Sequence, residues 1–121
     1  TTLAEMAKVV KELGADGDKV QVLFVSVDPE RDTQQLLSQY VTAFNPKFVG
    51  LRGDMDATLK AAKEFKVYVN KQTPNKNGSY SVDHSAGTFV IDQKGQLRLF
   101  AQHNAAAQAL AADIRTLLGA R

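Results

Sequence analysis

The residues best suited to chemistry in this chain are a histidine and a carboxylate that each adjoin an apolar run. His84 lies in the segment SVDHSAGTFVID, shortly before the predicted strand Thr88–Ile91, and Asp28 directly follows the run VQVLFVSV. These residue types could contribute to a metal or redox site, and they can also serve only as hydrogen-bonding groups in turns. A single loop histidine is a weak signal for a metal site.

The other candidate ligands have simpler interpretations. Met6 falls on the apolar stripe of a predicted helix and Met55 at a predicted helix start, which favours packing for both. His103 precedes a predicted helix cap and is expected at the surface. Asp28 stands before Pro29, so it either accepts a hydrogen bond in the turn or orients a neighbouring histidine ligand, and the residues alone leave both roles open.

The composition narrows the classes of function. The 121 residues are 44% hydrophobic and 23% charged, with a net charge of +2 from 15 basic and 13 acidic residues. This balance argues against a nucleic-acid surface, which needs clustered basic residues. No apolar run reaches the length of a membrane span. The chain contains no cysteine, so it forms neither a disulfide nor a thiolate metal site from its own residues.

The elements that must position His84 and Asp28 follow from the spacing of apolar residues. Helical spacing predicts helices, a β-branched apolar run predicts a strand buried on both faces, and turn residues separate them. The predicted elements are a helix over 3–13 ended by Gly14, a strand over 20–27, a helix from Asp32 or Thr33 to Phe44, a strand over 48–51, a helix from Asp54 or Asp56 to Phe65, a hairpin of 67–69 with 80–82, a hairpin of 88–91 with 96–100, and a helix from a cap at Asn104 to Gly119.

We expect residues 70–80, with their Asn-Gly turn, to be the most mobile internal segment.

This order of elements predicts an α/β fold with a mixed sheet. The strand over 20–27 needs neighbours on both sides, yet the chain opens on a helix. We therefore expect this strand and Thr88–Ile91 to be antiparallel without being adjacent. Ligand sites in such sheets lie beyond the carboxyl ends of the parallel strands. That rule predicts that Asp28, His84 and the start of the first helix lie at one edge.

Three segments carry a resemblance to a known family. VQVLFVSVDPERDT, FNPKFVGLRGD and YSVDHSAGTFVIDQKGQL resemble the SCO/SenC family of cytochrome c oxidase assembly proteins over essentially the whole chain. The resemblance implies a thioredoxin-like fold, with a central mixed β-sheet flanked by helices. It also implies a copper site made of the two thiolates of a Cys-x-x-x-Cys-Pro motif and a histidine. His84 matches that histidine, and Asp28 matches an acidic residue close to the copper.

The resemblance also implies how the chain relates to the complete protein. The opening TTLAEM resembles the residues directly after the Cys-Pro of the family motif. We therefore expect residues 1–121 to be one SCO/SenC domain that lacks its first core strand and its cysteine loop at the amino terminus. The imidazole of His84 is expected to face the position of that loop. Copper would then bind in the complete protein, and weakly or not at all to this chain.

For function, the resemblance implies a copper metallochaperone for the dinuclear copper centre of cytochrome c oxidase. Its partner would be subunit II or another copper or thiol protein, with no nucleic acid. A membrane anchor outside this sequence would hold it at the periplasmic face of the bacterial inner membrane. The alternative is a thiol-disulfide oxidoreductase acting on envelope proteins, since a cysteine pair serves both roles. A parent protein without cysteines would leave an inert interaction module.

Overall fold

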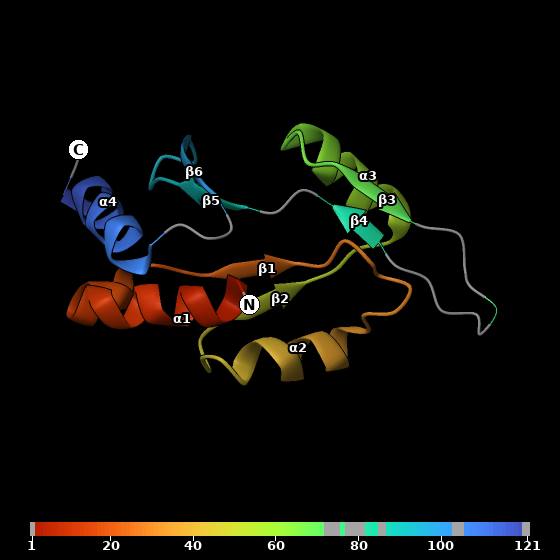
Figure 1. Cartoon of the computed structure of the whole chain (residues 1–121), viewed down its shortest axis with the longest axis horizontal. Helices are drawn as coiled ribbons and strands as arrows, with labels where there is room; N and C mark the ends of the chain where they lie inside the picture. Colours follow the sequence, from red (N-terminus) through yellow and green to blue (C-terminus); the bar gives the residue numbers. More distant parts are fainter. Residues whose placement is uncertain (1, 72–75, 77–81, 85–86, 103–105, 120–121) are drawn as a thin grey trace. The chain divides into compact units, whose positions relative to one another are not determined.

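The computed structural model describes residues 2–71, 76, 82–84, 87–102 and 106–119. The chain forms two compact units. Unit 1 comprises Thr1–Val22, Phe44–Phe48 and Ala86–Arg121, and unit 2 comprises Leu23–Ala43 and Val49–Ser85. The elements in chain order are α1 (Thr2–Leu13), the 3-10 helix η1 (Gly14–Lys19), β1 (Leu23–Val25), α2 (Gln34–Thr42), β2 (Val49–Leu51), α3 (Met55–Glu64), β3 (Val69–Lys71), β4 (Val82–His84), β5 (Thr88–Ile91), β6 (Leu97–Ala101) and α4 (Ala107–Gly119) (Figure 1).

Unit 1 is built on two helices that lie side by side, α1 and α4 (Figure 1). Their apolar residues recur at helical spacing, so each helix presents one apolar stripe. The stripes meet in a buried core to which the hairpin β5–β6 adds the partly buried Val90 and Ala101. The buried members of this core are Val9, Leu13, Leu110, Ala111 and Ile114.

The hairpin β5–β6 is closed by a turn that Asp92 organises. The Asp92 carboxylate accepts hydrogen bonds from the backbone N–H groups of Lys94 and Gln96, both over 2.9 Å. Gly95 has a φ of +79°, a conformation that glycine adopts without steric cost. The hairpin predicted for 88–91 with 96–100 is confirmed, with a register shift between Val90 and Ile91.

Unit 2 contains the parallel pair β1–β2 and the helix α2 that connects the two strands. Leu37 and Val41 of α2 are buried, and Gly50 of β2 lies directly beneath Leu37. Phe24 of β1 meets Tyr40 of α2 edge to face, with ring centroids 6.1 Å apart. Since strand side chains alternate between faces, α2 covers the face of Phe24 and Gly50.

The predicted burial of this first strand on both faces is wrong for the described structure. Leu23 and Val25 are 55% and 52% exposed, because they lie on the face opposite α2. The strand is also shorter than the apolar run, since β2 offers only Val49–Leu51 as pairing partners. In the described residues β1 pairs with β2 and β5 with β6. We predicted that β1 and β5 run antiparallel to each other, and this stays a prediction.

The helices of unit 2 begin where their capping residues predict. Thr33 Oγ1 accepts a hydrogen bond from the Leu36 N–H over 3.2 Å at the start of α2. Asp54 Oδ1 accepts one from the Ala57 N–H over 2.7 Å at the start of α3. These bonds satisfy backbone donors that a helix start leaves without an internal acceptor.

The antiparallel pair β3–β4 corrects the predicted position of His84. We expected His84 in a loop, but it is the last residue of β4 and pairs in register with Val69. The shift arises at the end of α3, where the Val67 N–H still donates to Ala62 O over 2.7 Å and Lys66 has a φ of 56°. Because this helix end uses Val67, β3 begins two residues later than predicted. The mobility expected for residues 70–80 stays a prediction, because most of these residues lie outside the described part of the chain. His103 and the predicted cap Asn104 also lie outside it.

Candidate functional site

Asp28 lies three residues beyond the end of β1, in the turn with the sequence DPERD. It is 6% exposed, which is unusual for a carboxylate. Burying a charged group is costly unless the group is paired and hydrogen-bonded. The turn around Asp28 supplies both kinds of interaction.

Arg31 provides the opposite charge. Its Nε donates to Asp28 Oδ2 in an ion pair within the turn. The turn brings the two side chains together because the N–H groups of Arg31 and Asp32 both donate to Asp28 O, over 3.2 and 3.0 Å. The backbone conformation of the turn therefore places the Arg31 guanidinium beside the Asp28 carboxylate.

Ser26 is the second organiser of the turn, and it is 2% exposed. Its hydroxyl donates to Asp32 Oδ2 over 2.6 Å and accepts from the Asp28 N–H over 3.1 Å. Its own N–H donates to Leu51 O over 2.9 Å, which attaches the start of the turn to the end of β2. The sequence does not indicate this role for Ser26, because a serine within an apolar run carries no signal for a contact with Asp32.

Arg52, which directly follows β2, stabilises the middle of the same turn. Its guanidinium donates to the carbonyl oxygen of Pro29 over 2.6 Å. Gln34, in the first turn of α2, donates to Gly50 O over 3.0 Å and so ties the helix start to β2. Asp28 thus occupies a turn that is fixed at its beginning, its middle and its end.

The two residues predicted to share a site, Asp28 and His84, belong to the same compact unit. Asp28 follows β1 and His84 ends β4. Their predicted position at one edge with the start of α1 stays a prediction. Among the described residues, no group of three or more His, Cys, Asp or Glu side chains is placed to hold a metal ion.

The types of metal-binding side chain in the sequence indicate whether it could bind copper. Copper sites in proteins are built from thiolates, thioethers and imidazoles, whereas carboxylates suit harder ions. The sequence supplies the imidazole of His84 and no cysteine. The imidazole is a suitable copper ligand, but a single imidazole is not such a donor set, and the predicted role of His84 as a metal ligand stays a prediction.

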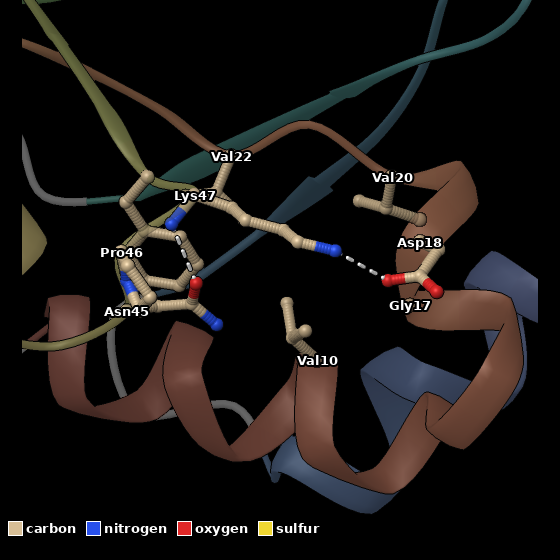
Figure 2. Close-up of a pocket in the computed structure, with 9 residues that line it drawn as sticks. Val10, Gly17, Asp18, Val20, Val22, Asn45, Pro46 and Lys47 are labelled. Atoms are coloured by element: carbon tan, nitrogen blue, oxygen red, sulfur yellow. Dashed lines mark hydrogen bonds and ion pairs between the residues drawn. The ribbon is translucent and has the colours of Figure 1, made fainter.

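A separate pocket of about 230 Å³ lies within unit 1. Its walls are largely apolar, and the Lys47 side chain extends across it above Val10 to meet Asp18 (Figure 2). Lys47 Nζ and Asp18 Oδ1 are 2.8 Å apart, and this hydrogen bond and charge lower the pKa of Asp18. The one carboxylate of the pocket is already paired, so the pocket offers no metal-ligand set. Its lining residues are Val10, Gly17, Asp18, Val20, Val22, Asn45, Pro46, Lys47 and Phe48.

Comparison with known sequences identifies the family. The profile of the SCO1/SenC family matches residues 1–119, so the chain belongs to this family. The mitochondrial SCO2 homolog of Danio rerio is 36% identical over 95 residues, which are 77% of this chain and 34% of that protein. The SCO2-like protein RP587 of Rickettsia prowazekii is 33% identical over 97 residues, which are 79% of this chain and 47% of that protein. The chain spans about a third to a half of the length of these relatives.

Comparison with solved structures confirms the predicted fold. The structure of Bradyrhizobium japonicum ScoI with copper bound matches 97% of this chain and 74% of its own, with a TM-score of 0.85 and 35% identity. The thioredoxin-like α/β fold implied by the resemblance is therefore confirmed. Relatives are found in mitochondria and in bacteria. In the described part of the chain, no helix has both the length and the apolar character needed to cross a membrane.

Proposed function

Starting from membership of the SCO1/SenC family, we propose that this protein carries copper for assembly of the dinuclear copper centre of cytochrome c oxidase. The observation that carries the proposal is the likeness to the copper-bound ScoI, at a TM-score of 0.85 over 97% of this chain. We propose that residues 1–121 belong to one domain. A segment with a Cys-x-x-x-Cys pair would complete its copper site.

In this proposal His84 supplies an imidazole and the cysteine pair supplies two thiolates. Thiolates select soft ions such as Cu(I), and an imidazole suits copper as well. Asp28 contributes a negative charge and hydrogen-bond acceptors beside the site without binding the metal. Carboxylates of this kind orient histidine ligands in many metal sites, and their loss costs about 10- to 100-fold in metal affinity.

The partner and the location belong to the same proposal. Copper passes to subunit II of the oxidase, or to another copper or thiol protein, by exchange of ligands between the two proteins. In a bacterium the delivery occurs at the periplasmic face of the inner membrane, to which an anchor outside these 121 residues attaches the protein.

A copper titration tests the proposal. The chain is extended before Thr1 by a segment that contains Cys-x-x-x-Cys-Pro, and Cu(I) affinity is measured against a competing chelator. We expect tight binding by the extended chain and weak binding by the 121 residues, because one imidazole cannot replace three ligands. His84→Ala should weaken binding by more than the roughly 10- to 100-fold typical for loss of a ligand's hydrogen-bonding partner.

The other histidine of the chain provides the control. His103→Ala in the same extended chain should leave the affinity unchanged. The cysteine pair should still form a disulfide in the His84→Ala variant, because thiol exchange requires no imidazole ligand. An affinity that is the same with and without His84 would overturn the copper proposal and favour thiol-disulfide oxidoreduction.

A further inference from the structure

The pocket of unit 1 is held in shape by contacts between segments that are distant in the sequence. Gln21 Nε2 donates to Lys47 O over 2.9 Å and to Val22 O over 3.0 Å, which fixes two of the lining segments to each other. Phe48 is 4% exposed, and Val20 packs against the buried core of α1 and α4. The walls of the pocket are therefore positioned by the fold itself.

The size and the lining of this pocket suit a small apolar group. The pocket measures about 230 Å³, and an apolar cavity of about 150 Å³ is enough to bind benzene. The side chains of Val10, Val20, Val22, Pro46 and Phe48 supply most of its walls. A ring or a short aliphatic chain that enters the pocket leaves water for an apolar surface, which is favourable.

The polar side chains that line the pocket are chiefly hydrogen-bond donors. Among the described lining residues they are Asp18, Asn45 and Lys47, and Lys47 extends across the pocket above Val10 (Figure 2). Asn45 Oδ1 accepts from the Lys47 N–H over 2.8 Å, so the amide of Asn45 retains its NH₂ group as a donor. An ammonium and an amide donor beside an apolar pocket favour a ligand with an anionic group.

The ion pair between Lys47 and Asp18 can be exchanged for another at little cost. The two side chains are 74% and 75% exposed, and Nζ lies 2.8 Å from Oδ1. Ion pairs this exposed contribute little to stability, because water and salt screen them. A second carboxylate can therefore replace Asp18 at Lys47 without disturbing any helix or strand. The methylene chain of Lys47 would then cover the apolar part of the ligand.

We propose that this pocket is a binding site for a small amphiphilic carboxylate, whose apolar part is an aromatic ring or a short branched chain. The apolar part lies against Val10 and Val22. The carboxylate replaces Asp18 as the partner of Lys47, and Asn45 is its second donor. This site shares no residue with the proposed copper site, so the inference goes beyond the proposed function and does not depend on it.

The experiment titrates the 121-residue chain with three probes of similar shape and follows the backbone amide signals of Val10, Val20 and Val22 by NMR. The probes are phenylacetate, 2-phenylethanol and 2-phenylethylamine, which carry a negative, no and a positive charge. We expect saturable shifts, with phenylacetate bound about 3-fold or more tightly than the other two, the scale of an exposed ion pair. Shifts that do not saturate would overturn the proposal, and so would equal or tighter binding of the alcohol or the amine.

Two substitutions in the ion pair should act in opposite directions. Lys47→Gln should weaken phenylacetate binding by about 3-fold or more and leave 2-phenylethanol binding nearly unchanged, because it removes the charge and keeps most of the side chain. Asp18→Asn should strengthen phenylacetate binding by up to about 5-fold, because the ligand no longer competes with a carboxylate of the protein. A phenylacetate affinity that Asp18→Asn does not raise would overturn the proposal.

Lys19→Gln provides the matched control. Lys19 forms a comparable pair with Asp16, over 3.2 Å in the same 3-10 helix as Asp18, and does not line the pocket. Its substitution should leave the three affinities unchanged. If Lys19→Gln and Lys47→Gln weaken phenylacetate binding equally, the probe responds to net charge alone and the proposal is overturned.

A substitution that fills the pocket tests the apolar part of the site. Val22→Phe should remove the binding of all three probes, because its ring occupies the space of theirs. Binding that persists in folded Val22→Phe would overturn the proposal. If Val22→Phe does not fold, the substitutions of Lys47 and Asp18 decide, since both residues are exposed and neither belongs to the core.

Discussion

The Ser26 hydroxyl donates a 2.6 Å hydrogen bond to the Asp32 carboxylate, and thereby closes the turn after β1. The same oxygen accepts from the Asp28 N–H, so one buried side chain satisfies two groups of the turn. Since Ser26 is 2% exposed, water has little access to replace it. The turn that places Asp28 therefore depends on a residue outside its own DPERD sequence.

We expect Ser26→Ala to destabilise the chain by about 1–3 kcal/mol, because it leaves the Asp32 carboxylate and the Asp28 N–H without this partner. The measurement is urea unfolding of the variant and the unsubstituted chain. Ser38→Ala is the control, because the Ser38 hydroxyl accepts an exposed bond from Gln34 that water can replace. Equal unfolding midpoints for the two variants would contradict the role given to Ser26.

The contact between β2 and α2 predicts a cost for enlarging Gly50. A Cβ atom at this position would lie 2.6 Å from Leu37 Cγ, and Leu37 is buried. Forcing a methyl group into a packed core costs about 1–3 kcal/mol, so Gly50→Ala should unfold at lower urea concentration. Gly119→Ala, at the end of α4, is the control, because among the described residues outside its own helix turn no atom lies within 4 Å of the added Cβ. If Gly50→Ala unfolds at the same urea concentration as the unsubstituted chain, Leu37 moves aside without a cost in stability.

The features that the sequence predicts well are those that depend on neighbouring residues. The caps at Thr33 and Asp54 and the turn at Asp92 each join groups two to four residues apart. Such bonds follow from backbone geometry, so residue types at fixed spacing are enough to predict them. Their positions were predicted to within a residue or two.

Features that depend on distant residues could not be predicted in this way. Lys47 and Asp18 are 29 positions apart, and Arg52 reaches Pro29 across 23 positions. The exposure of Leu23 and Val25 depends on which face α2 covers, which an apolar run does not reveal. His84 was assigned through a family motif, and its place in β4 required the register with Val69.

The start of α3 gives a prediction that separates hydrogen bonding from charge. Asp54 Oδ1 accepts from the Ala57 N–H over 2.7 Å, so Asp54→Ala should cost about 0.5–2 kcal/mol of stability. Asp54→Asn retains an acceptor and should lose much less. Asp56→Ala removes a charge from the first turn of the same helix without removing the cap, and should cost about 0.3–1 kcal/mol. The stability of each variant is measured from its unfolding midpoint in urea. If Asp54→Asn loses as much stability as Asp54→Ala, the charge of Asp54 matters more than its hydrogen bond.

The last prediction concerns acid and the turn of the hairpin β5–β6. The pKa of Asp92 is held below its ordinary value, chiefly because the Gln96 N–H donates to its carboxylate, with further help from Arg98 and the Lys94 N–H. Because the pKa is lower in the folded chain than in the unfolded one, the ionised carboxylate stabilises the fold. That contribution is fully present above the unfolded pKa of about 3.9 and is lost as the pH falls through the folded pKa.

Asp92→Asn should therefore lower stability at neutral pH and make stability less dependent on pH below about pH 4. The measurement is the urea midpoint of the variant and the unsubstituted chain at neutral pH and at several values from about pH 5 down to about pH 2. The matched control is Asp113→Asn, which changes an exposed carboxylate in α4 and should leave the difference between neutral and acid stability nearly unchanged. If Asp92→Asn and the unsubstituted chain lose stability in parallel on acidification, the hydrogen bonds of this turn do not depend on the charge of Asp92.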